Sequence, residues 1–199
     1  MLTILATILV VLVFAQRYRI NHLHKKEKCV AIVLGSGGHT AEMLRSITPW
    51  KQSARLVAIC ANSDLRSPIL FEKHMNERGV KNPTIFRIPR ARVVSQSWLT
   101  TPFTVLISLV YTVSLLWKCD MDVLLCNGPG TCVPVCVVVY IANIFGLLKT
   151  EIVFIESVAR VKSLSLSGKI VYYLADVFLV QWPDLAKMYP ATQYNGRLV

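Results

Sequence analysis

The segment GSGGHT, residues 35–40, follows an apolar run and precedes a helical pattern. Backbone N–H groups at the start of a helix bind phosphate together with the helix dipole, and glycine lets a ligand approach the backbone closely. The segment is not a Walker A loop, because no Gly-Lys-Ser/Thr sequence follows it. A tight turn without a ligand is the alternative. The residues expected to bind a phosphorylated ligand here are Gly35, Ser36, Gly37, Gly38 and Thr40.

Two residues have side chains suited to proton transfer. His39 stands at the predicted start of a helix, which disfavours the charged imidazolium and leaves a neutral imidazole able to accept a proton. Glu156 follows the apolar run 151–155 and could act as a base or bind sugar hydroxyls. Arg160, four residues later, could bind phosphate. A structural Glu156–Arg160 pair is the alternative.

A second glycine turn, CNGPGT at residues 126–131, also follows an apolar run. In an open α/β sheet such turns lie at the carboxyl edge of the strands, where ligands bind. The segment FIESVAR, residues 154–160, is expected at that same edge. The further candidate binding residues are Asn127, Gly128, Gly130, Thr131 and Ser157.

A nicotinamide cofactor is an alternative ligand for the first turn. The G-x-G-x-x-G fingerprint is incomplete, because its sixth position is Thr40 instead of Gly or Ala. Asp64 follows the second apolar run and could imitate the acid that binds the ribose. A membrane-anchored oxidoreductase therefore stays open as an alternative.

We expect no metal site. Asp120 and Asp122 form an Asp-x-Asp pattern, but they precede a strand, at the opposite edge from the glycine turns, and are interpreted as solvated acids of a turn. The six cysteines form no Cys-x-x-Cys pair, and the histidine spacing does not match zinc. Free, buried cysteines in a reducing compartment are expected.

Alternating apolar strands and helices position these residues. Buried, β-branched runs separated by helical patterns indicate a parallel sheet with right-handed crossovers, a Rossmann-like doubly wound α/β domain. The predicted strands are 29–34, 55–60, 84–88, 122–126, 151–155 and 176–180. The predicted helices are 40–46, 69–79, 97–118, 133–148 and 163–175.

The N-terminus predicts a membrane anchor. An uncharged run, residues 2–15, precedes Arg17, Arg19 and three lysines, which is the reverse of the order in a signal peptide. The positive-inside rule then places the following chain in the cytosol. We assign residues 1–16 to a single-pass anchor, 17–28 to a basic juxtamembrane segment and 29–199 to the α/β domain. Because the run is short, an interfacial helix is the alternative.

Composition supports a membrane protein that binds an anionic ligand. The chain is 54% hydrophobic, 17% charged and has a formal net charge of +11. No nucleic-acid-binding signature accompanies this charge. The apolar run 101–117 could also lie on the membrane surface, because the basic segment RIPRAR, residues 87–92, precedes it. A helix packed on the sheet beside a solvated basic loop is the alternative.

Six segments taken together resemble one family. GSGGHTAEML, RIPRAR, CNGPGTCVP, FIESVAR, LSLSGKI and VQWPDL are similar to the membrane-anchored subunit of the eukaryotic dolichol-linked N-acetylglucosaminyltransferase. The likeness extends over nearly all of residues 29–199. The glycine-histidine turn also resembles that of the bacterial enzyme that adds N-acetylglucosamine (GlcNAc) to lipid-linked muramyl-pentapeptide.

This resemblance implies the N-terminal, acceptor-side half of a GT-B glycosyltransferase. A small cytosolic partner subunit would bind UDP-GlcNAc, so this chain would bind no cofactor of its own and would be inactive alone. The complex would transfer GlcNAc to dolichyl-diphosphate-GlcNAc at the endoplasmic reticulum membrane, with inversion. The C-terminal segment YNGRLV, residues 194–199, is implicated in holding the partner.

The resemblance also suggests roles for the candidate residues. His39 is the first candidate for the base that activates the acceptor 4-hydroxyl, and Glu156 is the second. The amides of residues 36–38, with Arg160, would hold the acceptor diphosphate or complete the cleft between the two chains. A scaffold that recruits the partner without supplying active-site residues is the alternative.

Overall fold

The computed structural model describes residues 27–48, 54–92, 96–97 and 99–198. They form a parallel six-stranded sheet with the order β3-β2-β1-β4-β5-β6. The strands are β1 (Lys28–Val33), β2 (Ala54–Ala61), β3 (Thr84–Ile88), β4 (Val123–Cys126), β5 (Glu151–Ile155) and β6 (Val177–Leu179). The helices are α2 (Gly38–Ile47), α3 (Arg66–Glu77), α4 (Thr101–Leu116), α5 (Cys132–Ile144), α6 (Leu166–Val171) and α7 (Pro183–Met188). The predicted doubly wound α/β fold is confirmed.

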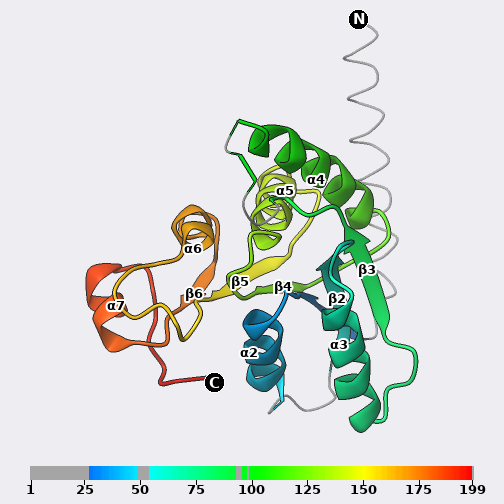
Figure 1. Cartoon of the computed structure of the whole chain (residues 1–199), viewed down its shortest axis with the longest axis horizontal. Helices are drawn as coiled ribbons and strands as arrows, with labels where there is room; N and C mark the ends of the chain where they lie inside the picture. The colour runs from blue at the N-terminus through cyan, green and yellow to red at the C-terminus, as the bar shows by residue number, and fades with distance from the viewer. Residues whose placement is uncertain (1–26, 49–53, 93–95, 98, 199) are drawn as a thin grey trace, which may run out of the picture.

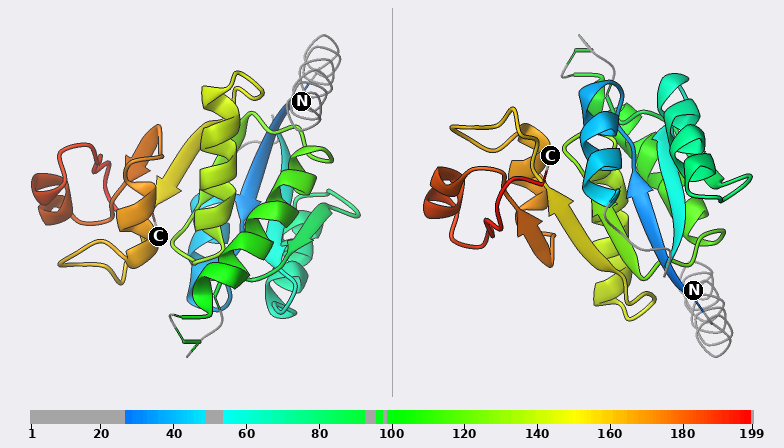
Figure 2. Two further views of the ribbon diagram at one scale, coloured as in Figure 1. Left: turned by 90° about the horizontal axis from the view of Figure 1, so that it is seen from above. Right: turned by 90° about the horizontal axis from the view of Figure 1, so that it is seen from below.

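Helices cover both faces of the sheet (Figure 1). Seen from above, α4 and α5 lie side by side over one face, and seen from below, α2 and α3 cover the other (Figure 2). Each face has its own apolar core: Met43 and Phe71 pack on the α2/α3 side, whereas Leu115 and Val139 pack on the α4/α5 side. Because the central strands are buried on both faces, they are apolar at consecutive positions instead of alternate ones.

The helices differ from the predictions mainly after β5. The helix expected over residues 163–175 is the short α6, which begins where the Ser165 hydroxyl accepts the N–H of Gly168 at 2.9 Å. The next helix, α7, was not predicted, although Pro183 in its first turn is a common start signal. Helix α5 ends at Ile144, short of the predicted residue 148, because Gly146 adopts φ 67° and terminates it.

Asp122 corrects one prediction. Its carboxylate is not merely solvated, because Oδ2 accepts the backbone N–H of Cys29 at 2.6 Å. Asp176 does the same for Ile152 at 2.7 Å, two strands further along the sheet. Both carboxylates thus tie the amino end of a neighbouring strand. All six cysteines are buried thiols that form no disulfide, as expected.

The predicted anchor, residues 1–16, lies outside the described residues, as does the basic segment up to residue 26. Within the described ranges, no helix has both the length and the apolarity that a membrane span requires.

Candidate functional site

The two glycine turns meet where the strand order reverses. From β1 the chain builds β2 and β3 on one side, and it then returns to β4 on the other side of β1. In such sheets ligands bind beyond the carboxyl ends at this switch point. The turns are in close contact there, because a Cβ on Gly35 would collide with the ring of Pro129. Gly35 is therefore required for the contact between the turns.

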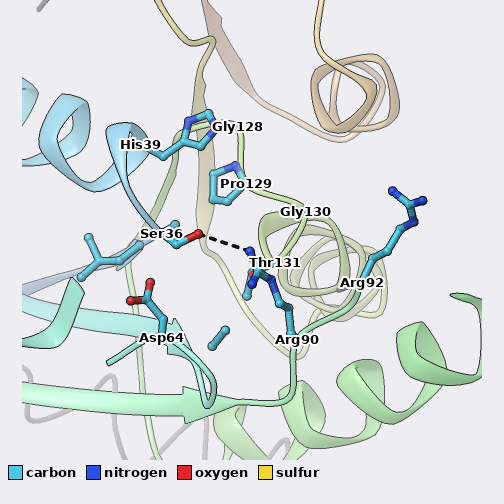
Figure 3. Close-up of a pocket in the computed structure, with 12 residues that line it drawn as sticks. Ser36, His39, Asp64, Arg90, Arg92, Gly128, Pro129, Gly130 and Thr131 are labelled. Atoms are coloured by element: carbon cyan, nitrogen blue, oxygen red, sulfur yellow. Dashed lines mark hydrogen bonds between the residues drawn. The ribbon is translucent and has the colours of Figure 1, made fainter. Parts of the chain in front are cut away.

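A pocket of about 190 Å³ opens between the turns (Figure 3). The predicted residues that line it are Gly35, Ser36, His39, Gly128, Gly130 and Thr131. The structure therefore brings both glycine turns and the candidate base to one cavity.

Arg90 and Arg92 also line this pocket, which sequence reasoning missed. They belong to RIPRAR, which was interpreted as a membrane-surface or solvated segment. Arg90 Nη2 donates to the Ser36 hydroxyl at 3.2 Å, so a guanidinium reaches the first glycine turn (Figure 3). The sequence contained a signal for this position, because Arg90 and Arg92 follow directly after β3 and so lie at the same carboxyl edge as the turns. The pocket thus combines cationic side chains with a helix N-terminus, a combination that suits an anion.

The remaining residues of the first turn lie beside the pocket. Gly37 and Gly38 are exposed at the start of α2, and among the described residues no side chain caps the N–H groups of this helix. Thr40 is fully buried, and its hydroxyl donates to the carbonyl of Gly35 and lies 2.7 Å from the Ser67 hydroxyl. Thr40 therefore supports the turn from behind, without lining the pocket.

Asp64 lines the pocket, but its carboxylate oxygens accept hydrogen bonds from the protein itself. Its Oδ1 accepts the backbone N–H of Ser67 at 3.0 Å, and its Oδ2 accepts the Ser67 hydroxyl at 2.6 Å. The carboxylate therefore caps the start of α3. This capping role explains why an acidic residue follows β2, and the explanation does not require a ribose ligand.

His39 is held by a chain of polar side chains. Its Nδ1 lies 3.0 Å from Oδ1 of Asn127, which is fully buried behind the pocket. Asn127 Nδ2 donates to Glu42 Oε2 at 3.3 Å, and the Ser157 hydroxyl donates to Glu42 Oε1 at 3.0 Å. Sequence reasoning missed Glu42, although its position three residues after His39 puts both on one helix face.

Glu156 lies in a closed environment instead of the pocket. It is fully buried, and its oxygens accept the backbone N–H groups of Ser157 at 3.1 Å and Ser165 at 2.9 Å, together with the Ser165 hydroxyl at 3.0 Å. A Cβ on Gly168 would collide with its Oε2. Burial raises the pKa of Glu156, while these hydrogen bonds and the charge of exposed Arg160 partly offset the shift.

The fold resembles that of MurG. The structure of Acinetobacter baumannii MurG matches with a TM-score of 0.59 and 13% identity, covering 87% of this chain and 44% of MurG. A structure of UDP-N-acetylglucosamine 2-epimerase matches with a TM-score of 0.56 and 13% identity, covering 82% of this chain and 44% of the epimerase. This chain thus has the fold of a MurG-like α/β domain and spans less than half of either protein.

Sequence comparison gives the family. Residues 30–198 match the model described as "Oligosaccharide biosynthesis protein Alg14 like", and the chain belongs to this family. The relative from Schizosaccharomyces pombe, named UDP-N-acetylglucosamine transferase subunit alg14, is 40% identical over 98% of this chain and 95% of its own length. The relative of the same name from Rattus norvegicus is 42% identical over 84% of this chain and 82% of its own length.

Proposed function

We propose that this chain is the acceptor-side subunit of a two-chain UDP-GlcNAc transferase. The complex moves GlcNAc to dolichyl-diphosphate-GlcNAc, the second step of lipid-linked oligosaccharide synthesis for protein N-glycosylation. The observation that carries the proposal is the switch-point pocket, in which Arg90, Arg92, the first glycine turn and His39 meet. Guanidinium groups and a helix N-terminus suit a diphosphate, and the imidazole suits a sugar hydroxyl beside it.

In the reaction, the acceptor 4-hydroxyl oxygen attacks the anomeric carbon of GlcNAc. The bond from that carbon to UDP breaks, UDP leaves with the bonding electrons, and His39 accepts the hydroxyl proton. Attack opposite the leaving group inverts the configuration at the sugar. Glu156 remains the second candidate base, but its burial and its three hydrogen bonds favour His39.

A partner chain supplies the donor site. The likeness to MurG extends over 44% of that protein, and the curated relatives of similar length are named as subunits. We therefore assign UDP-GlcNAc to a small cytosolic subunit that closes over the carboxyl edge of this sheet. This chain binds no cofactor and is inactive without that partner.

The C-terminal segment is a proposed contact for the partner. It follows Gln193, which forms a β-bridge with Leu179 of β6. Arg197 lies 4.0 Å from the ring centroid of Trp182, and the Leu198 N–H donates to Gln181 at 2.9 Å. These contacts hold residues 197 and 198 against the α/β domain, which presents them as a fixed surface for the partner.

Helices α4 and α5 support a location at the membrane. Helix α4 has an inverted pattern: Ser108 and Thr112 are fully buried, whereas Phe103 is 70% exposed. Phe145, directly after α5 on the same face of the sheet, is 73% exposed. The exposed apolar residues of this surface also include Leu106, Ile107, Val110, Tyr111, Ile141 and Ile144. Apolar surface of this extent suits contact with lipid.

We place the protein at the endoplasmic reticulum membrane. Residues 1–16 form the single-pass anchor with a lumenal N-terminus, and the α/β domain, residues 29–199, lies on the cytosolic face. The basic segment 17–28 lies between them and contacts the anionic leaflet. The pocket is thereby kept close to a lipid-linked acceptor.

Co-expression tests the proposal. The full chain is purified with and without a candidate cytosolic subunit, and transfer from UDP-GlcNAc to a lipid-diphosphate acceptor is measured. We expect activity only from the pair. Transfer by this chain alone would contradict the split enzyme. A scaffold-only role would instead leave the activity of the pair intact when pocket residues are replaced.

A further inference from the structure

We infer that Glu42 is a positioning residue for His39 and acts on it through Asn127. The inference rests on the proposed function, in which His39 accepts a proton. Helix α2 carries His39 and Glu42 three residues apart, and the fully buried amide of Asn127 contacts both. Asn127 was predicted to bind substrate, and its contacts give it a different role.

The chemistry of the chain determines the direction of each hydrogen bond. An ionised carboxylate only accepts, so Glu42 requires the donor side of the Asn127 amide, its Nδ2, at 3.3 Å. The amide oxygen must then face His39, where it lies 3.0 Å from Nδ1. An amide oxygen only accepts, so the proton of a neutral His39 is on Nδ1. Nε2 is therefore the unprotonated nitrogen.

Other contacts make this arrangement rigid. The Ser157 hydroxyl donates to Glu42 Oε1 at 3.0 Å, which ties α2 to the turn after β5. Gly128 lies against the imidazole ring (Figure 3), and a Cβ there would be 2.8 Å from Cε1 of His39. Within the described residues His39 Nε2 has no hydrogen-bond partner, while His39 itself lines the pocket. The nitrogen left free by the chain is thus the one available to an acceptor hydroxyl.

The charge of Glu42 has a second effect. When His39 takes a proton it becomes an imidazolium, and a carboxylate linked through one amide stabilises that charge. Replacement by Gln preserves an oxygen that accepts from Asn127 and removes the charge. Replacement by Ala removes both. The two variants therefore separate orientation from electrostatic stabilisation.

A double-mutant cycle with His39 tests the positioning role in the purified two-chain complex. We expect Glu42→Ala to lower kcat about 10–100-fold, the range seen when partners that orient a histidine are removed. Glu42→Gln should lose less, and KM for both substrates should change little. In the His39→Ala background, Glu42→Ala should have almost no further effect. Glu72→Ala, an exposed glutamate on α3, is the matched control.

An equal loss of kcat in both backgrounds would show that Glu42 acts independently of His39, and would overturn the inference. Nitrogen-15 NMR of labelled histidines gives a readout that needs no turnover. The His39 signals, identified by their loss in His39→Gln, should show Nδ1–H in the wild type and a shift toward Nε2–H in Glu42→Ala. An Nε2–H wild-type ring would also overturn it. Absence of transfer by the wild-type complex would instead refute the proposed function.

Discussion

The carboxyl ends of β1 and β4 are open, whereas the carboxyl end of β5 is closed. Beyond β1 and β4, His39 and the second glycine turn line a pocket, which Arg90 also lines from the segment after β3. Beyond β5, Glu156 is fully buried, and both of its oxygens accept hydrogen bonds from protein groups. In the sequence both places look alike, as an apolar strand followed by polar residues. Whether a polar side chain can act on a ligand therefore depends on whether it still has a hydrogen-bonding atom that no protein group occupies.

The largest effect is expected at the open end. His39→Ala should lower kcat about 10²–10⁴-fold, the usual contribution of a general base, with no loss of folding. Turnover of the purified complex at saturating substrate measures this. His74→Ala, on α3 away from the pocket, is the control. Near-normal turnover of His39→Ala, with activity abolished in Glu156→Ala, would instead assign the role of the base to Glu156.

Gly128→Ala should distort the open end through the backbone and the ring together. Gly128 has φ 64°, and its Cβ would lie 2.8 Å from His39 Cε1. Gly146→Ala is the matched control, because Gly146 has φ 67° but open space around it. Both variants should lose about 1–2 kcal/mol of stability. Only Gly128→Ala should lower kcat, by about 10–100-fold. Equal kcat values for the two variants would show that the contact between residue 128 and His39 does not matter for turnover.

Arg90→Ala should weaken acceptor binding. Loss of one guanidinium contact to a diphosphate should raise the KM for the lipid acceptor about tenfold and leave the KM for UDP-GlcNAc unchanged. Initial rates with each substrate varied in turn measure both constants. Arg45→Ala, at the exposed end of α2, is the control. A rise confined to the UDP-GlcNAc constant would place the donor, not the acceptor, at this pocket.

At the closed end, Glu156→Gln should affect stability instead of turnover. In this variant an amide NH₂ would replace a carboxylate oxygen that accepts a hydrogen bond from a backbone N–H. Two donors would then face each other, which should lower the free energy of unfolding by about 1–3 kcal/mol. Activity per folded complex should stay near the wild-type value. Denaturant unfolding and kcat measure the two, with exposed Glu151→Gln as the control on the same strand. If Glu156→Gln were stable but inactive, Glu156 would have a catalytic role and not a structural one.

The smallest expected effect is a pH dependence of stability. Because burial raises the pKa of folded Glu156, a proton binds the folded chain more tightly than the unfolded one. The stabilising contribution of protonated Glu156 is complete below the unfolded pKa of about 4.3, and it is lost as the pH rises through the higher folded pKa. The difference in unfolding free energy between wild type and Glu156→Gln should therefore fall with rising pH in that window. A difference that rises with pH would contradict the raised pKa.

The sequence predicted the strands better than the site. The strands over 84–88 and 151–155 have the predicted bounds, because buried parallel strands leave continuous apolar runs. Both glycine turns also lie where expected. Arg90 was missed because a basic run after a strand is equally typical of a solvated loop. Glu42 was missed because its partners Asn127 and Ser157 are 85 and 115 residues away in the chain.

The sequence by itself determined the alternating α/β order, the glycine turns after β1 and β4, and the family. These features follow from local backbone geometry and from the burial of apolar runs. Only the tertiary structure decided which polar residues remain open to a ligand: His39 faces the pocket and Glu156 is enclosed. It also turned the apolar side of α4 outward. These outcomes depend on packing between distant segments, which local patterns do not encode.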